Sequence, residues 1–259
     1  MSSRNVEVPI HELMLIGGQK VDGLVRIEVR NPARPDDLVG TVVRGTPGHV
    51  DEAVAAAKAV QPAWAALTFA QRAQRLEAGI ATLENDIERR AAVFVRENGK
   101  PLAEARGELM SVPKRQQMAL GYAAELDAGR SLAAPHGRTF VFNRPYGVVV
   151  SIVPWNSPVS LAFTQVVAAL LAGNCVVLKP PETCPLALIR SVMMFAEALL
   201  CGHRTTVGDR RCADHSSGRG QDWIHWQHSV GPPHHGERRA DNQRRDARTG
   251  WERCGNRAG

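Results

Sequence analysis

Apolar and polar positions divide the chain into a β-rich start, a helical middle and a second region that mixes strands and helices. Between Met14 and Arg44, short apolar stretches are separated by Gly17-Gly18, Asp22-Gly23 and Asn31-Pro32. Such pairs are typical of turns between strands. Residues 14–44 therefore predict a small antiparallel β meander.

The next region, residues 48–126, has the periodicity of helices. Val50, Val54 and Ala57 share one helical face. Thr68 and Gln71 form a capping box that opens a second helix, which we expect to run as far as Gly99. Its apolar stripe consists of Leu76, Ile80, Leu83, Ile87 and Phe94. A third helix is predicted near Leu102–Leu126.

Residues 139–200 predict a β-α-β unit. After a strand pair around Thr139–Phe142, the segment Gly147–Val153 is a nearly continuous run of β-branched residues, which suits a strand buried on both faces of a parallel sheet. Ser157-Pro158 opens a helix that Gly173 closes. A second buried strand, Cys175–Leu178, and a helix over Pro185–Leu200 complete an α/β pattern.

Polar residues follow both predicted strands of this unit. Pro154-Trp155-Asn156 comes after the first strand, and Lys179 and Glu182 come after the second. In open α/β sheets, ligands bind beyond the carboxyl ends of the strands. The unit contains no G-x-G-x-x-G, so it lacks the ordinary dinucleotide fingerprint. Asn156 could equally be a turn residue, and Lys179 with Glu182 a solvated charge pair.

Two longer motifs make the interpretation specific. Gly147–Pro158 (GVVVSIVPWNSP) and Ala172–Glu182 (AGNCVVLKPPE) resemble the G-V-x-x-x-I-x-P-W-N-x-P and G-N-x-V-V-x-K-P-x-E signatures of the aldehyde dehydrogenase superfamily. Glu97–Leu102 (ENGKPL) and Asn143–Gly147 (NRPYG) also fit. The resemblance covers residues 15–200. It implies that residues 1–200 form a truncated, partial Rossmann-like NAD-binding domain of the aldehyde dehydrogenase fold.

The resemblance also implies roles for individual residues. Asn156 would donate its side-chain amide to the oxyanion of a thiohemiacetal. Lys179 and Glu182 would hold the hydroxyls of the adenosine ribose, and Glu182 would repel a 2′-phosphate, so NAD fits better than NADP. The residues implied to line the cofactor channel are Ile152, Val153, Pro154 and Trp155.

The family's reaction is the NAD-dependent oxidation of an aldehyde to a carboxylic acid by a cysteine thiolate. Cys175 and Cys184 lie outside the family's nucleophile context, and we interpret both as structural. The family's nucleophile and its general-base glutamate are expected to be missing from this chain. A substrate aldehyde would then find no thiolate to attack it.

Residues 201–259 differ from the rest in composition. They contain no Leu, Phe, Tyr or Met, and they hold most of the histidines and most of the formal net charge of +6. A segment so poor in aliphatic residues cannot build a core, so we expect a disordered tail. None of the motifs that follow in the family, L-P-x-G-x-x-N-V-V, F-T-G-S and E-L-G-G, occurs in it.

A shift of reading frame explains the tail. When the codons of residues 220–227 are read one base later, the genetic code permits V-K-I-G-F-T-G-S, with Trp226 forcing a glycine. Further on, Arg248 to Trp251 permits E-L-G-G, again with a forced glycine. Ile224 and Arg248 are 24 positions apart, close to the family's spacing of the two motifs. The tail is therefore predicted to be a frameshifted part of the same gene, as in a pseudogene.

Other functions of the chain stay open. A fragment of this kind could dock on an intact homologue, which co-purification would detect. Cys201-x-His203 and Cys212-x-x-His215 could hold zinc in a basic nucleic-acid module, but this spacing matches no strong finger pattern. We expect no metal and no nucleic-acid partner.

The five cysteines are too few and too irregularly spaced for a disulfide framework, which agrees with a reducing compartment. Glu7, His11 and Glu12 interrupt the first apolar stretch, and no later stretch is apolar enough to span a bilayer. We expect a cytoplasmic protein with no membrane partner.

Overall fold

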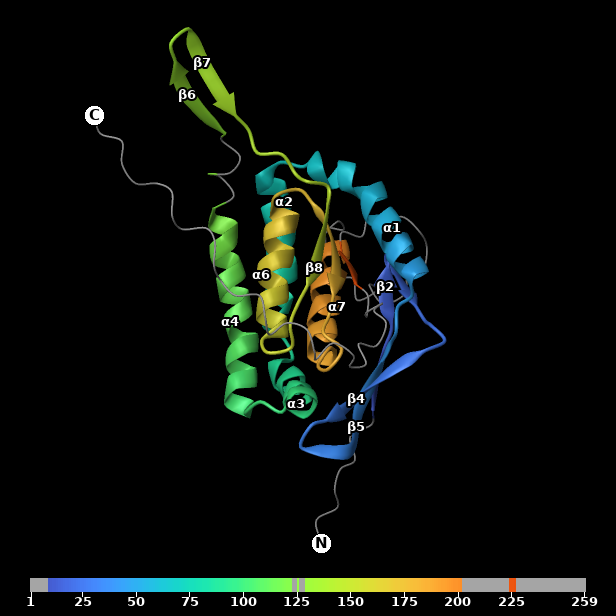
Figure 1. Cartoon of the computed structure of the whole chain (residues 1–259). Coiled ribbons are helices and arrows are strands. Elements are labelled where there is room, and N and C mark those ends of the chain that lie inside the picture. Colours follow the sequence, from blue (N-terminus) through green and yellow to red (C-terminus); the bar gives the residue numbers. More distant parts are fainter. Residues whose placement is uncertain (1–8, 123–124, 126–128, 202–223, 227–259) are drawn as a thin grey trace, which may run out of the picture.

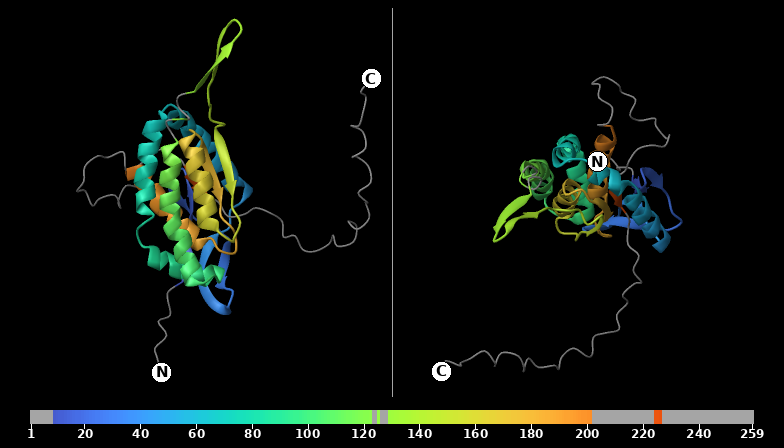
Figure 2. Two further views of the ribbon diagram at one scale, coloured as in Figure 1. Left: turned by 90° about the vertical axis from the view of Figure 1, so that its left-hand side faces the viewer. Right: turned by 90° about the horizontal axis from the view of Figure 1, so that it is seen from above.

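The computed structural model describes residues 9–122, 125, 129–201 and 224–226 (Figures 1 and 2). Its first sheet has three strands in the order β1-β5-β4. β1 (Ile10–Glu12) runs parallel to β5 (Arg34–Val43), and β5 pairs antiparallel with β4 (Arg26–Asn31). Gly40 allows the close approach of β1, because a Cβ at this position would lie 2.3 Å from the Ile10 carbonyl oxygen.

The remaining N-terminal strands join a different sheet. β2 (Met14–Ile16) and β3 (Gln19–Val21) form a hairpin that turns at Gly17 and Gly18, both with positive φ. The prediction of one meander over residues 14–44 is therefore wrong, because the segment divides between two sheets. Turn residues indicate only which strands follow each other in the sequence, and they do not indicate which strands pair in a sheet. The parallel partner of β5, β1, also lies before the predicted segment.

Four helices follow: α1 (Pro47–Ala65), α2 (Phe69–Thr82), α3 (Ile87–Asn98) and α4 (Leu102–Gly121). The capping box at the start of α2 is confirmed, since Gln71 N donates to Thr68 Oγ1 and Thr68 N donates to Gln71 Oε1. The single helix predicted up to Gly99 is in fact two, α2 and α3. Asp86 adopts a left-handed conformation in the break, and Arg90 donates to the carbonyl oxygens of Leu83 and Asn85 there.

The β-α-β prediction is confirmed in a five-stranded sheet of order β3-β2-β10-β9-β8. β8 (Val148–Ile152) and β9 (Cys175–Lys179) pair in parallel, and α6 (Pro158–Leu171) connects them. α7 (Leu186–Cys201) follows β9. The helices α6 and α7 pack together with α2, α3 and α4 on one side of the sheet, while α1 packs against β9 from the other side (Figure 1).

The last strand, β10 (Ile224–Trp226), comes from the tail that was expected to be disordered. It runs parallel to β9 and antiparallel to β2. For these three residues the expectation of a disordered tail is therefore wrong. The rest of the predicted tail, residues 202–223 and 227–259, lies outside the described residues.

The two neighbouring strands β8 and β9 differ in how far they are buried. Cys175 to Leu178 of β9 are buried, as predicted for a strand covered on both faces. β8 differs: Ser151 hydrogen-bonds Gln165 of α6, whereas Val150 and Ile152 on the opposite face are 57% and 64% exposed. The prediction for β8 is therefore wrong on one face. Within the described residues, α1 lies mainly over β9 and leaves this face of β8 open.

The predicted strand pair around Thr139–Phe142 is a hairpin that begins earlier, with β6 (Arg130–Ala134) and β7 (Gly137–Val141). It projects away from the body of the protein (Figures 1 and 2). Phe140 and Phe142 are exposed, with stacked rings whose centroids are 6.3 Å apart. None of the helices in the described ranges combines the length and apolar character needed to cross a bilayer.

Candidate functional site

The candidate site lies where β8 and β9 end side by side. Ile152 and Lys179 are direct partners in the parallel pairing, and Val153 N donates to Lys179 O at 3.3 Å. The structure therefore brings together the two groups of polar residues that the sequence placed after separate strands. Lys179 is the last residue of β9, whereas Asn156 and Glu182 lie in the loops that follow β8 and β9.

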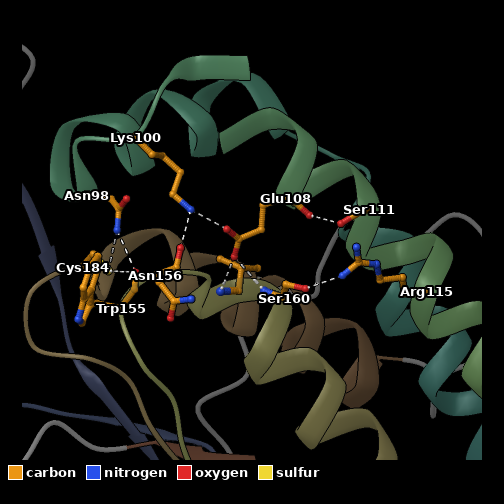
Figure 3. Close-up of polar contacts among 10 residues, drawn as sticks. Asn98, Lys100, Glu108, Ser111, Arg115, Trp155, Asn156, Ser160 and Cys184 are labelled. Atoms are coloured by element: carbon orange, nitrogen blue, oxygen red, sulfur yellow. Dashed lines mark hydrogen bonds and ion pairs between the residues drawn. The ribbon is translucent and has the colours of Figure 1, made fainter. Parts of the chain in front are cut away.

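The loop after β8 presents most of its side chains to solvent. Ile152 and Trp155 are 64% and 62% exposed, and Pro154 and Asn156 are also exposed. The side chain of Asn156 points away from Lys100 (Figure 3) and makes no hydrogen bond to the described residues. Its amide is thus available as a donor. Val153 differs from its neighbours, because its side chain is 4% exposed and belongs to the core.

Lys179 and Glu182 offer a donor and an acceptor beside this loop. Lys179 is half-buried, and its Nζ donates to the Pro180 carbonyl oxygen at 3.2 Å. Glu182 is exposed. In the described part of the chain the two side chains form no ion pair with each other, and the Lys179 ammonium has N–H donors beyond the one that Pro180 accepts. An ammonium and a carboxylate suit the hydroxyls of a ribose, which the cofactor NAD carries.

The turn between α3 and α4 holds the backbone of the loop. Asn98 Nδ2 donates to the Trp155 carbonyl oxygen at 2.9 Å, and Lys100 Nζ donates to the Asn156 carbonyl oxygen at 3.0 Å (Figure 3). Gly99, between them, has a φ of 83° and closes α3. A side chain at Gly99 would be strained in this conformation and would meet Pro32.

Two carboxylates of the same helices cap the helices of the β-α-β unit. Glu108 Oε1 accepts from Val159 N and Ser160 N, both at 3.0 Å, at the start of α6. Glu97 accepts from Leu186 N at 2.7 Å and Ala187 N at 2.8 Å, at the start of α7. Helix N-termini are common sites for phosphate groups. Here the carboxyl groups of Glu108 and Glu97 already occupy both.

Charge and burial affect the two capping groups differently. Glu108 forms an ion pair with Lys100 at 2.7 Å, and their side chains are only 7% and 10% exposed. Lys100 also lies over the ring of Phe94, 4.1 Å from its centroid. Burial raises the pKa of Glu97 to about 8, although the hydrogen bonds from Ala187 and Leu186 act in the opposite direction.

The cysteines near the site are poor nucleophiles. Cys175 and Cys184 are buried, and burial raises the pKa of each thiol to about 12. Cys184 Sγ donates to the Trp155 carbonyl oxygen at 3.2 Å and accepts from Asn98 at 3.5 Å. Because the reactive species is the thiolate, both cysteines are inert at neutral pH. Their burial agrees with the structural interpretation made from the sequence.

Sequence reasoning missed Glu97, Asn98, Lys100 and Glu108 as parts of the site. The ENGKP motif contains three of them, but on the sequence alone it indicates only the family resemblance. Glu108 gave no signal of its own, because a glutamate in a helix usually faces solvent. No group of His, Cys, Asp or Glu side chains in the described ranges is arranged to hold a metal ion. The predicted Cys/His alternative, His203, Cys212 and His215 included, lies outside those ranges.

Comparison with known proteins identifies the family. The family model described as "Aldehyde dehydrogenase family" matches residues 20–207. The chain belongs to the aldehyde dehydrogenase family. The matched range includes both strand ends of the site and the turn between α3 and α4. The prediction of family and of fold class is therefore confirmed.

Individual family members match over a part of their length. The chain is 32% identical over 194 residues to the bifunctional protein PutA of Escherichia coli, covering 72% of this chain and 14% of PutA. It is 37% identical over 145 residues to N-succinylglutamate 5-semialdehyde dehydrogenase of Novosphingobium aromaticivorans, covering 56% and 31%. The crystal structure of an NAD-dependent aldehyde dehydrogenase from Sinorhizobium meliloti superposes with a TM-score of 0.73 at 26% identity, covering 89% and 43%. The chain thus spans less than half the length of each of these relatives.

Proposed function

We propose that residues 1–200 are the first part of the NAD-binding domain of an aldehyde dehydrogenase whose reaction is the oxidation of an aldehyde to a carboxylic acid. The observation that carries the proposal is the adjacency of Ile152 and Lys179, which sets the Asn156 loop beside Lys179 and Glu182. The likeness to an NAD-dependent aldehyde dehydrogenase from Sinorhizobium meliloti supports the choice of cofactor.

In this proposal Lys179 donates to the ribose hydroxyls of the adenosine half of NAD, and Glu182 accepts from them. The exposed side chains of Ile152, Pro154 and Trp155 form the wall of the cofactor channel, with Val153 supporting the loop from the core. Bound NAD would supply the hydride acceptor. The free amide of Asn156 would stabilise the oxyanion that forms when a thiolate attacks the aldehyde, an interaction of about 3 kcal/mol in comparable sites.

We further propose that the polypeptide as translated does not oxidise aldehydes. The described thiols Cys175 and Cys184 are buried with a pKa of about 12, so neither provides a thiolate. In an assay of NAD reduction with aliphatic and aromatic aldehydes, the purified chain should show no turnover above the background without protein. A matched intact family member serves as the positive control. Turnover that depends on the chain would refute its inactivity.

The frameshift is proposed as the origin of the tail. The shifted codons of residues 220–227 and 248–251 permit F-T-G-S and E-L-G-G in one frame, at a consistent spacing. Sequencing the gene and its transcript from codon 195 to beyond codon 259 should spell both motifs one base later, in a frame that stays open to a cysteine. If the bases at Ile224 and His225 instead spell serine or tyrosine followed by isoleucine, the tail is a genuine part of the chain.

A further inference from the structure

One motif of the sequence has no role in the proposed chemistry. The turn Glu97–Pro101 (ENGKP) ends α3 and begins α4, and its side chains do not belong to the strand ends that face the ligand. Three of its residues nevertheless contact the loops after β8 and β9. We propose that this turn, here called the brace turn, is the positioning element of the site: it fixes the Asn156 loop and the loop that carries Glu182.

Contacts with the first loop support this role. Asn98 and Lys100 donate to the carbonyl oxygens of two consecutive residues (Figure 3). Asn98 donates to Trp155 at 2.9 Å, and Lys100 donates to Asn156 at 3.0 Å. Because both bonds go to the backbone, they fix the course of the chain and leave the side chain of Asn156 unhindered. A donor must be held at a set place to stabilise a developing charge.

The ion pair of Lys100 extends the same support to the end of the loop. Glu108 joins the ammonium of Lys100 at 2.7 Å and binds Val159 N and Ser160 N through its other oxygen. The loop is therefore held before Asn156 by Asn98, at Asn156 by Lys100, and after it by Glu108. The pair is nearly buried, so solvent screens it little.

Contacts with the second loop come from the same turn. Glu97 accepts from Leu186 N and Ala187 N, where α7 begins four residues after Glu182. Cys184 lies between Glu182 and the start of α7, and it hydrogen-bonds both Asn98 and the Trp155 carbonyl oxygen. The brace turn thus joins the two loops to each other as well as to the helices.

The inference rests on the proposed function only for the role of the loops, which is to bind NAD and to stabilise the oxyanion. That the turn fixes the loops can be tested without ligand, by hydrogen exchange of the full chain measured by mass spectrometry. The informative amides are those with known partners around the loop: Val153, Val159, Ser160 and Leu161. The Asn98→Ala variant removes only half-buried contacts and should fold. Lys100→Met removes the ammonium.

Asn98→Ala should raise the exchange rate in peptides over residues 153–161 by about tenfold or more while the core strand β9 keeps its protection. Lys100→Met, which also lowers the overall stability, should raise exchange more in these peptides than in β9. Lys100→Arg, which keeps a cationic donor, should restore most of the protection. The matched control is Arg106→Gln, which breaks the exposed Arg106–Glu88 ion pair between the same two helices and should leave residues 153–161 unchanged. No local rise in Asn98→Ala and Lys100→Met, or an equal rise along the whole chain, would overturn the inference.

A second arm tests the proposed function by itself. Adding NAD at millimolar concentration to the unaltered chain should slow exchange in peptides that contain residues 150–156 and 176–183. If NAD has no effect while the variants still loosen the loop, the brace turn stands and the cofactor proposal fails. If NAD protects these peptides and the variants change nothing, the cofactor proposal stands and the brace turn fails.

Discussion

Replacing Glu108 with alanine is expected to lower the free energy of unfolding by about 3–5 kcal/mol, the usual loss when one partner of a buried ion pair is removed. The substitution leaves Lys100, whose side chain is 10% exposed, without its carboxylate. It also removes the acceptor for Val159 N and Ser160 N at the start of α6. Urea denaturation followed by circular dichroism measures the change.

The matched control for this substitution is Glu88→Ala. Glu88 of α3 likewise forms an ion pair with a residue of α4, Arg106, but its side chain is 70% exposed. Exposed ion pairs contribute about 0–1 kcal/mol, so the control should remain near the stability of the unaltered chain. If both variants lose the same small amount, Lys100 and Glu108 are not buried in solution.

The stability of the chain should fall as the pH rises from about 4.5 to about 8, with a slope of up to about 1.4 kcal/mol per pH unit from Glu97. Burial raises the pKa of Glu97 from 4.5 to about 8, so the folded chain holds a proton that the unfolded chain releases. The stabilisation is complete below the pKa of the unfolded state. It is lost as the pH passes through the folded value.

The comparison that isolates this effect is Glu97→Gln, which cannot titrate. Denaturation of both proteins at pH 5, 6.5 and 8 should show a difference in free energy that changes with pH over this window. Glu12 also has a raised pKa, through burial, but it is present in both proteins and cancels. Parallel pH curves for the two proteins would show that Glu97 is not the titrating group.

The central unit could be predicted from sequence because its signals are local. The β-branched runs that became β8 and β9, and the Ser157-Pro158 and Gly173 boundaries of α6, lie within one continuous segment. The break between α2 and α3 could not be predicted from periodicity, because Leu83 is buried although it lies just beyond the end of α2. Apolar spacing reports which residues face the core, and it continues across a short break.

Contacts between distant segments account for most of what the sequence did not show. The hydrogen bonds of Asn98 with Trp155 and of Glu97 with Leu186 join positions 57 and 89 residues apart. The residue types of Asn98 and Glu97 are also common on solvated helices. One face of β8 is exposed because α1 lies mainly over β9, and the sequence of β8 gives no information on the position of α1. Association with an intact homologue stays a prediction. Co-purification would test it, and Phe140 and Phe142 are exposed apolar residues that can be replaced in such a test.

The pairing of β10 with β2 has a consequence for the order in which the protein is made. Trp226 lies opposite Leu15, so the N-terminal hairpin cannot take its final place until the segment around residue 226 has left the ribosome. At roughly 5–20 residues per second, the delay is on the order of 10–40 seconds. During that time Met14, Leu15 and Ile16, all buried in the finished fold, have no β10 beside them. Until the chain is complete, one edge of the sheet is therefore an unpaired apolar strand, the kind of surface that makes incomplete folds prone to aggregate.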